Sequence, residues 1–217
     1  MARLTRSFFD RHTPTVAKDL LGTVLVRVLN GERLSGMIVE TESYRGAKDP
    51  ASHAYHGKTK RNALMFGEGG YAYVYFSYGF HWCLNVTTEP AGRPGAVLIR
   101  SVEPIEGLRQ MMRNRSLNSD EHVTDGPGKL AQAFGIDSTL NGEDMVVSRR
   151  LFVEKGRKLK GISSSSRVGI RQGVEYRWRF YVKESEFVSR AKPTSHTESI
   201  TKAGEDAKLV GSSASLV

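Results

Sequence analysis

The segment from Tyr71 to Val86, YAYVYFSYGFHWCLNV, constrains the fold of this chain more than any other part of it. Tyrosines at alternating positions in its first half place three phenol rings on one face of a strand. A Ser-Tyr-Gly interruption and a second alternating run follow, so we predict a β-hairpin with Tyr78 at or beside its tip. A core has little use for so many phenols, because each buried hydroxyl needs a partner. The rings therefore indicate a surface that stacks on flat ligands, of which nucleobases are the most common.

Size and cysteine content predict one domain in a reducing compartment. The 217 residues suit a single large domain, and Cys83 is the only cysteine. A lone cysteine excludes an internal disulfide and a cysteine-rich zinc site, and its apolar strand predicts a small buried side chain. The N-terminal region lacks the apolar run of a signal peptide, and no segment approaches the ~20 apolar residues of a membrane span. We expect a cytoplasmic protein, nucleoid-associated in a prokaryote, without membrane contact.

Net charge points to a polyanionic partner. The chain carries +9 at neutral pH, and its last 26 residues, 192–217, contribute three lysines against three acidic residues. The whole excess therefore lies in residues 1–191, and a basic globular body favours DNA or RNA. A merely basic surface would give the same total. Residues 191–217 lack hydrophobic periodicity, which predicts a domain over 1–190 and a disordered tail.

Hydrophobic periodicity predicts mixed helices and strands. Asn30-Gly31 between two apolar runs predicts a second tight hairpin. The expected strands are 23–29, 32–44, 96–102, 145–155 and 178–184, the last two flanking a loop at 163–166. The expected helices are 13–21, 60–66, 104–115 and 128–134.

Two carboxylates on one strand are the first candidate for chemistry. On an extended strand Ile38, Glu40, Glu42 and Tyr44 share a face. Unpaired buried charges are costly, so we expect the strand to emerge at its C-terminal end into a cleft or into solvent. Two interpretations remain open here: a solvated edge strand, or a general base held beside an aromatic ring.

Two loops and one strand end carry further candidates. Asp49 and His53 in the loop DPASHAYH match no zinc or calcium spacing, so we expect a hydrogen-bonding or stacking histidine and no metal. The turn TDGPGKL places Lys129 in the first turn of a helix, which predicts a phosphate contact or an ordinary turn. Its spacing differs from that of a nucleotide-binding P-loop. Arg100 ends an apolar strand, so its charge must leave the core or meet an anion.

Read together, the motifs resemble one family. ETESY, DPASHAY, KRNALMF, YVYFSYGFHWCLN, VLIRSVEPIEGL, DGPGKLAQAFGI, SSRVGI and RFYV follow one another as in the alkyladenine (3-methyladenine) DNA glycosylases. The resemblance runs from Leu4 to Arg190. It implies an α/β (α+β) fold, a single compact domain around a curved, mainly antiparallel sheet with a protruding aromatic hairpin.

The resemblance also implies an activity. A member of this family acts as a monomer, without cofactor or metal, on double-stranded DNA that contains damaged purines. It flips the base out and hydrolyses its N-glycosidic bond with water as the nucleophile. The implied substrates are alkylated or deaminated purines: 3-methyladenine, 7-methylguanine, hypoxanthine or ethenoadenine. Neutral bases would need protonation on leaving, and no acid is evident in the sequence.

Residue roles are carried over motif by motif. Glu42 resembles the general base, and Arg100 the arginine that holds the water and a flanking phosphate. The implied base pocket consists of Tyr44, His53 and Tyr75 around the flipped base, Asn85 against the amine of normal guanine, Leu98 as a wall and Val168 beside the water. Tyr78 resembles the residue that fills the vacated gap in the duplex, with Phe80 and Lys129 as further DNA contacts. Phe80 departs from the methionine of the human-type enzyme, and the connection 87–95 is longer, which leaves open how Phe80 contacts the opposite strand.

Two other classes share some of these residues. A non-catalytic nucleic-acid-binding protein would have the charge and the rings but would not need Glu42 beside Tyr44. A metal-dependent nuclease would use four residues together, namely Glu40, Glu42, Asp49 and His53. Activity in excess chelator distinguishes these classes from a glycosylase.

Overall fold

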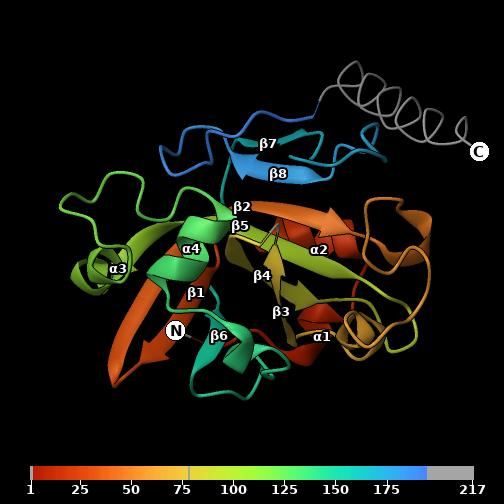
Figure 1. Ribbon diagram of the computed structural model, residues 1–217, viewed down its shortest axis with the longest axis horizontal. Coiled ribbons are helices and arrows are strands. Elements are labelled where there is room, and N and C mark those ends of the chain that lie inside the picture. The colour runs from red at the N-terminus through yellow and green to blue at the C-terminus, as the bar shows by residue number, and fades with distance from the viewer. Residues whose placement is uncertain (1, 78, 195–217) are drawn as a thin grey trace, which may run out of the picture.

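The fold is organised around one long strand, β2 (Glu32–Tyr44) (Figure 1). Its first half pairs with β1 (Val24–Leu29) through a tight hairpin at Asn30-Gly31, where both residues have positive φ, 51° and 83°. Asn-Gly favours this backbone, so the predicted hairpin is confirmed. Farther along, β2 pairs on the same edge with β8 (Arg179–Val182), and on its other edge with β5 (Ala96–Glu106). Strands on both edges make β2 an interior strand of the sheet.

The computed structural model describes residues 2–77 and 79–194. Within them the sheet has the order β3-β4-β5-β2-β1-β6, β7 lies beside β8, and every strand pair is antiparallel. This curled sheet with few helices forms a single compact α+β domain, as expected (Figure 1). The other strands are β3 (Ala72–Ser77), β4 (His81–Thr87), β6 (Leu151–Glu154) and β7 (Ile162–Ser165). The helices are α1 (Arg6–Phe9), α2 (Thr13–Asp19), α3 (Leu108–Asn114) and α4 (Pro127–Ala133), with 3₁₀ turns η1 (Gly46–Lys48), η2 (Ala63–Phe66) and η3 (Ser138–Leu140).

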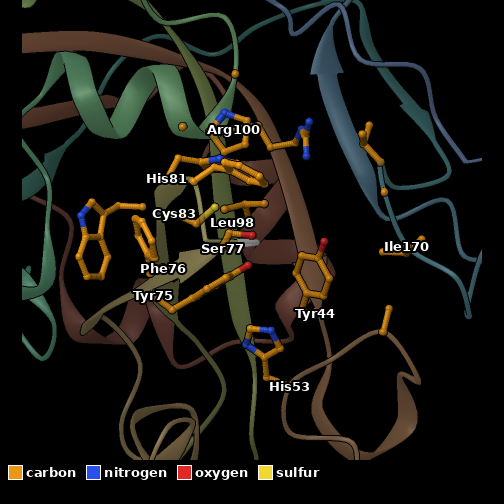
Figure 2. Close-up of a pocket in the computed structure, with 18 of the residues that line it drawn as sticks. Tyr44, His53, Tyr75, Phe76, Ser77, His81, Cys83, Leu98, Arg100 and Ile170 are labelled. Atoms are coloured by element: carbon orange, nitrogen blue, oxygen red, sulfur yellow. The ribbon is translucent and has the colours of Figure 1, made fainter. Parts of the chain in front are cut away.

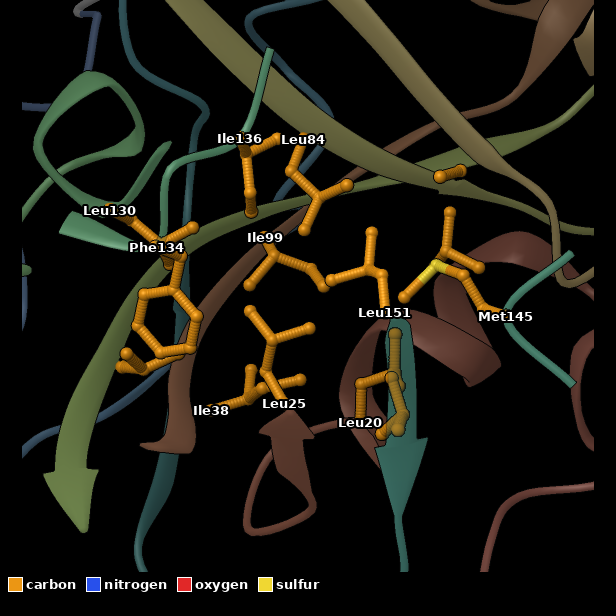
Figure 3. Close-up of a cluster of buried hydrophobic side chains, with 14 of the residues drawn as sticks. Leu20, Leu25, Ile38, Leu84, Ile99, Leu130, Phe134, Ile136, Met145 and Leu151 are labelled. Carbon is orange, nitrogen blue, oxygen red and sulfur yellow. The ribbon is translucent and has the colours of Figure 1, made fainter. Parts of the chain in front are cut away.

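The hydrophobic core lies between the sheet and two helices (Figure 3). Helix α2 packs against β2 and β5, and α4 packs against β4 and β5. Ile38 and Ile99 from the central strands are fully buried in this cluster. Leu130 from α4 and Phe134, which directly follows this helix, are buried with them. Burial of each such side chain contributes roughly 1.5–3 kcal/mol, so the core holds the central strands firmly. Within the described residues, no helix is both long and apolar enough to cross a bilayer.

Several predicted boundaries are wrong. The strand predicted at 96–102 continues to Glu106, so the helix predicted from Pro104 begins only at Leu108. Pro104 lies opposite Gly36 at a register irregularity, where a missing N–H is tolerated, and Gly107 then turns the chain at φ 77°. The loop predicted at 163–166 is mostly the strand β7. The predicted helix 60–66 reduces to η2, and the strands in 145–155 and 178–184 shorten to β6 and β8.

Candidate active site beside the aromatic hairpin

The predicted hairpin is present as β3 and β4, and its two faces have different neighbours. Cross-strand pairing sets Tyr75 opposite Cys83 and Tyr73 opposite Asn85 on one face. The other face directs Leu84 into the core, and Phe76 and Trp82 beyond it pack with ring centroids 4.9 Å apart. Alternation along two paired strands therefore separates this aromatic face from the main core. Tyr73 is nevertheless buried in a second cluster with Met65, so of the three predicted phenols only Tyr75 lines the groove beside this face.

That face forms one wall of a groove of about 1270 Å³ (Figure 2). Tyr75 and Cys83 line it from the hairpin, Tyr44 from β2, and Leu98 and Arg100 from β5. Three connecting segments complete its walls: the loop around His53, His56 and Arg61, the segment Val168–Gln172, and the start of α4 from Gly126 to Lys129. The sheet and the flanking loops thus bring residues from distant parts of the sequence to one concave surface.

Three rings converge at one end of the groove. Figure 2 shows Tyr44, His53 and Tyr75 on β2, a loop and β3 around the same space. The ring centroids of His53 and Tyr75 are 4.6 Å apart, and His53 Nδ1 lies 2.8 Å from the Tyr73 hydroxyl. Partial burial, with a contribution from Arg61, lowers the pKa of His53, so its imidazole is neutral at neutral pH. The rings form an apolar slot of a kind that accepts a planar ligand.

A smaller cavity of about 20 Å³ lies beside these rings. Asn85 and Tyr73 line it together with Tyr44, His53 and Tyr75. Asn85 is buried, and its amide donates to the backbone carbonyl of Tyr73 at 3.1 Å, which fixes its orientation. A buried amide held in this way can discriminate between ligands by shape and by hydrogen bonding.

Glu42 lies at the hydroxyl end of Tyr44 with no exposed side-chain surface. The Tyr44 hydroxyl donates to Glu42 Oε2 at 2.8 Å, and the backbone N–H of Val168 donates to Oε1 at 2.8 Å. Arg100 Nη1 lies 3.2 Å from the same Oε1. Burial, and then the neighbouring Glu42 charge, raise the pKa of Tyr44 well above its ordinary value, so Tyr44 remains a donor. Charge-assisted contacts of this kind offset the cost of a buried carboxylate.

Glu40 is also fully buried but has a different set of partners. Arg100 Nε donates to it at 2.8 Å and Arg179 Nε at 2.6 Å. Ser189 donates from both its backbone N–H, at 2.7 Å, and its hydroxyl, at 2.9 Å, and Ser101 adds a hydroxyl at 3.2 Å. Burial alone would raise the pKa of Glu40, but Arg100 and Arg179 outweigh it and hold that pKa below its ordinary value.

These contacts correct the interpretation of the strand as a solvated edge. Both glutamates lie on an interior strand, and buried arginines and hydroxyls compensate their charges. The expectation that these carboxylates leave the core is therefore wrong, since burial requires paired charges and the fold supplies the partners. Arg100 meets anions, as its position predicted, and all three of its side-chain nitrogens have partners in Glu40, Glu42 and Ser189.

The remaining predicted residues lie at different depths. Leu98 is buried in the wall of the groove, and Val168 is half-buried at its rim. Phe80 is 85% exposed near the hairpin end, whereas Tyr78 lies outside the described residues. Lys129 lines the groove and pairs with Asp125 at 2.6 Å. Cys83 is buried beside Tyr75, as predicted, and burial raises the pKa of its thiol.

Sequence reasoning missed a buried ion pair between Asp49 and Arg167. Arg167 Nη1 lies 2.6 Å from Asp49 Oδ2, and Nη2 lies 2.7 Å from Oδ1, with neither side chain exposed. An arginine next to the apolar VGI and an aspartate before a proline were the available signals, but the two residues are 118 positions apart. A metal-dependent nuclease would use Asp49 and Glu40 among its four ligands. In this structure both carboxylates are instead paired with arginines.

The comparisons with known proteins place this chain in one enzyme class, the DNA glycosylases. The family model described as Methylpurine-DNA glycosylase (MPG) matches residues 7–186. The chain therefore belongs to the methylpurine-DNA glycosylase family, and it is a DNA glycosylase of DNA repair.

Curated relatives agree over most of the chain. A protein of Carboxydothermus hydrogenoformans is 47% identical over 189 residues, which cover 86% of this chain and 98% of the relative. A protein of Methanocella arvoryzae is 47% identical over 197 residues (89% and 98%), and one of Salinibacter ruber 46% over 207 residues (89% and 100%). All three bear the name "Putative 3-methyladenine DNA glycosylase".

Proposed function

We propose that this DNA glycosylase flips an alkylated or deaminated purine out of duplex DNA and hydrolyses its N-glycosidic bond, acting as a monomer. Its groove is the proposed binding site for the extruded base. Chemistry on a base within a duplex requires extrusion, which costs a few kcal/mol and least for weakly stacked bases. Stacking on aromatic rings returns about 1–3 kcal/mol per base, so Tyr44, His53 and Tyr75 offset that cost.

The environment of Glu42 carries this proposal. Its carboxylate lies against Tyr44, one of the rings that line the groove, and is held by Val168 and Arg100. A carboxylate fixed beside a binding slot suits a general base that takes a proton from water as the water attacks the anomeric carbon. Arg100 and Val168 orient that carboxylate. Because the Arg100 nitrogens contact protein acceptors, its proposed role is to hold Glu42 rather than a DNA phosphate.

The same groove supports a preference for cationic bases. N-alkylation gives a purine a formal positive charge, and electron-rich ring faces attract cations. A cationic purine is also a good leaving group, so it departs without a general acid. Neutral hypoxanthine needs a proton on leaving, and His53, the imidazole beside Tyr75, is neutral at neutral pH. We therefore propose 3-methyladenine and 7-methylguanine as the preferred substrates, ahead of hypoxanthine and ethenoadenine.

Base release in excess EDTA is the test of this function. The enzyme is incubated with methylated duplex DNA, and free bases, abasic sites and strand breaks are quantified separately. We expect chelator-resistant release of methylpurines, with abasic sites left intact until alkali is added. Loss of all activity in EDTA would indicate a metal-dependent nuclease, whereas binding without base release would indicate a non-catalytic DNA-binding protein. Direct strand cleavage would contradict the proposed hydrolysis by water, which breaks the N-glycosidic bond alone (a monofunctional glycosylase).

A further inference from the structure

The buried pair of Arg167 and Asp49 joins the segments that surround Glu42. Besides its two bonds to Asp49, the Arg167 guanidinium donates to the backbone carbonyl of Ser43 at 2.9 Å and to that of Gly173 at 3.3 Å. Ser43 belongs to β2 and Asp49 follows the turn η1. Gly173 lies in the same β7–β8 connection, residues 166–178, as Arg167 itself. One side chain thereby ties three backbone segments together with a planar fork of donors.

Arg167 also contacts two of the groups that hold Glu42. Its guanidinium carbon lies 4.7 Å from the centroid of the Tyr44 ring, whose hydroxyl donates to Glu42. The next residue, Val168, donates its backbone N–H to the other carboxylate oxygen. Displacement of Arg167 would therefore move both donors at once. The side chain has no exposed surface and does not line the groove, so it acts through Tyr44 and Val168 and not on the base itself.

We propose that Arg167 and Asp49 form a positioning pair that holds Tyr44 and Val168 on Glu42 and balances the charge behind the base-binding ring. This inference rests on the proposed function. A buried ion pair is weak evidence for a stabilising role, because apolar residues of similar volume often stabilise as well. A role in geometry and charge explains why a fully buried guanidinium lies against this ring.

Charge balance gives the pair an effect on substrate choice. The guanidinium faces the same π system that would attract a cationic purine on the groove side of Tyr44, and Asp49 compensates its charge. Removing Asp49 leaves a positive charge behind the ring and disfavours cationic bases. Removing Arg167 leaves a negative charge and favours them. The two halves of the pair should therefore shift lesion preference in opposite directions.

The test compares Arg167→Met and Asp49→Asn with Arg6→Met, which breaks the Arg6–Asp144 pair outside the groove. Single-turnover release of 7-methylguanine and of hypoxanthine is measured, with duplex affinity and thermal unfolding in parallel. Misplaced groups in an active site lower rates steeply, so both site variants should lose about 10- to 100-fold in rate at nearly unchanged affinity. The ratio of 7-methylguanine to hypoxanthine release should rise about two- to fivefold in Arg167→Met and fall by about as much in Asp49→Asn.

Arg6→Met should lose thermal stability while keeping its rates and its ratio. Arg167→Lys retains the positive charge but not the planar set of guanidinium donors. It should therefore release both bases more slowly without changing the ratio of their rates. This variant serves as the test if Arg167→Met does not fold. The proposed positioning role would be overturned if the ratio of 7-methylguanine to hypoxanthine release changed in the same direction in Arg167→Met and Asp49→Asn. It would also be overturned if these variants folded and kept wild-type rates. Failure of the wild-type enzyme to release either base would instead contradict the proposed function.

Discussion

Glu40 and Glu42 are two positions apart on β2, yet their carboxylates have different chemical environments. Glu40 accepts from two arginines and two serines and is enclosed by them. Glu42 shares one oxygen between Val168 and Arg100, and its other oxygen meets Tyr44 at the edge of the groove. Both carboxylates are fully buried, but only Glu42 accepts from Tyr44 and Val168, which line the groove. This contact with the groove wall is the reason that we propose Glu42, and not Glu40, as the general base.

Replacing Glu42 by glutamine removes the proposed base with little change in shape. Single-turnover excision should fall by roughly 10²–10⁴, because the amide cannot take a proton from water. Affinity for damaged duplex should stay near wild type, as measured by fluorescence anisotropy. An equal loss in Glu40→Gln with little effect of Glu42→Gln would mean that Glu40 is the base.

Glu40→Gln should instead affect stability. Removing one partner of a buried ion pair costs about 3–5 kcal/mol, so the unfolding temperature should drop at neutral pH. The pKa of Glu40 is lower in the folded protein than its ordinary value of 4.5, so its stabilising contribution is complete above 4.5 and is lost as the pH falls below it. The difference between wild type and variant should therefore shrink with acidification. Unfolding temperatures of wild type and Glu40→Gln, measured across that pH range, give this difference. A difference that stays constant with pH would contradict a stabilising role for the ionised Glu40.

At the scale of secondary-structure elements, local signals predict the hairpins better than the connections. Alternation and turn chemistry were enough for Asn30-Gly31 and for the pair β3 and β4. Pro104 resembles a helix start, but pairing with β2 overrides that local preference. The serines of β7 carry no apolar alternation, and only their pairing with β8 makes them a strand.

The candidate site shows the same division. Spacing on one strand was enough to place Glu42 beside Tyr44, because the two side chains share a face. The burial of Glu40 and Glu42 was not predictable from that spacing, since the compensating partners come from distant segments. Arg167 with Asp49, and Ser189 with Glu40, depend on tertiary contacts that no local pattern encodes.

The hairpin end is the element we expect to enter DNA. Tyr78 lies outside the described residues, but Gly79 beside it has φ 72° and open space around it. If Tyr78 fills the gap left by the flipped base, Tyr78→Ala should disfavour the extruded state by a few kcal/mol. Fluorescence of 2-aminopurine placed beside the lesion measures the extruded population. The effect of Tyr78→Ala on this population should be smaller when the lesion lies in a mismatch, because extrusion then gives up less stacking.

Phe80 offers a matched control at the same hairpin end. It is 85% exposed, so Phe80→Ala should leave the unfolding temperature unchanged. If the Tyr78→Ala variant still flips the base but unfolds at a lower temperature, Tyr78 is a core residue and not the wedge. In that case loss of flipping in Phe80→Ala would identify Phe80 as the wedge.

At the scale of the whole molecule, charge should control binding. The net charge of +9 lies within residues 1–191, so affinity for damaged and undamaged duplex should fall steeply with salt. Lys129 lines the groove, and its contact with Asp125 can be exchanged for a DNA phosphate. Lys129→Ala should lower the slope of log affinity against log salt by about one unit for both duplexes.

Lys18, exposed on α2 and outside the groove, is the control for net charge. Lys18→Ala changes the total charge equally and should leave the slope near wild type. Equal slopes for wild type and Lys129→Ala would mean that the turn before α4 serves only the fold.

The single thiol, Cys83, has a consequence for the proposed reaction on methylated purines. Methylating electrophiles damage purines, and they also modify proteins, where the thiolate is the most reactive sulfur species. Cys83 lies in the groove wall, but its burial raises the pKa of the thiol and keeps it protonated. We therefore expect this thiol to react more slowly with methylating reagents than an exposed cysteine would. A glycosylase that acts on the proposed methylated purines would keep its groove wall unmodified at Cys83 while such reagents are present.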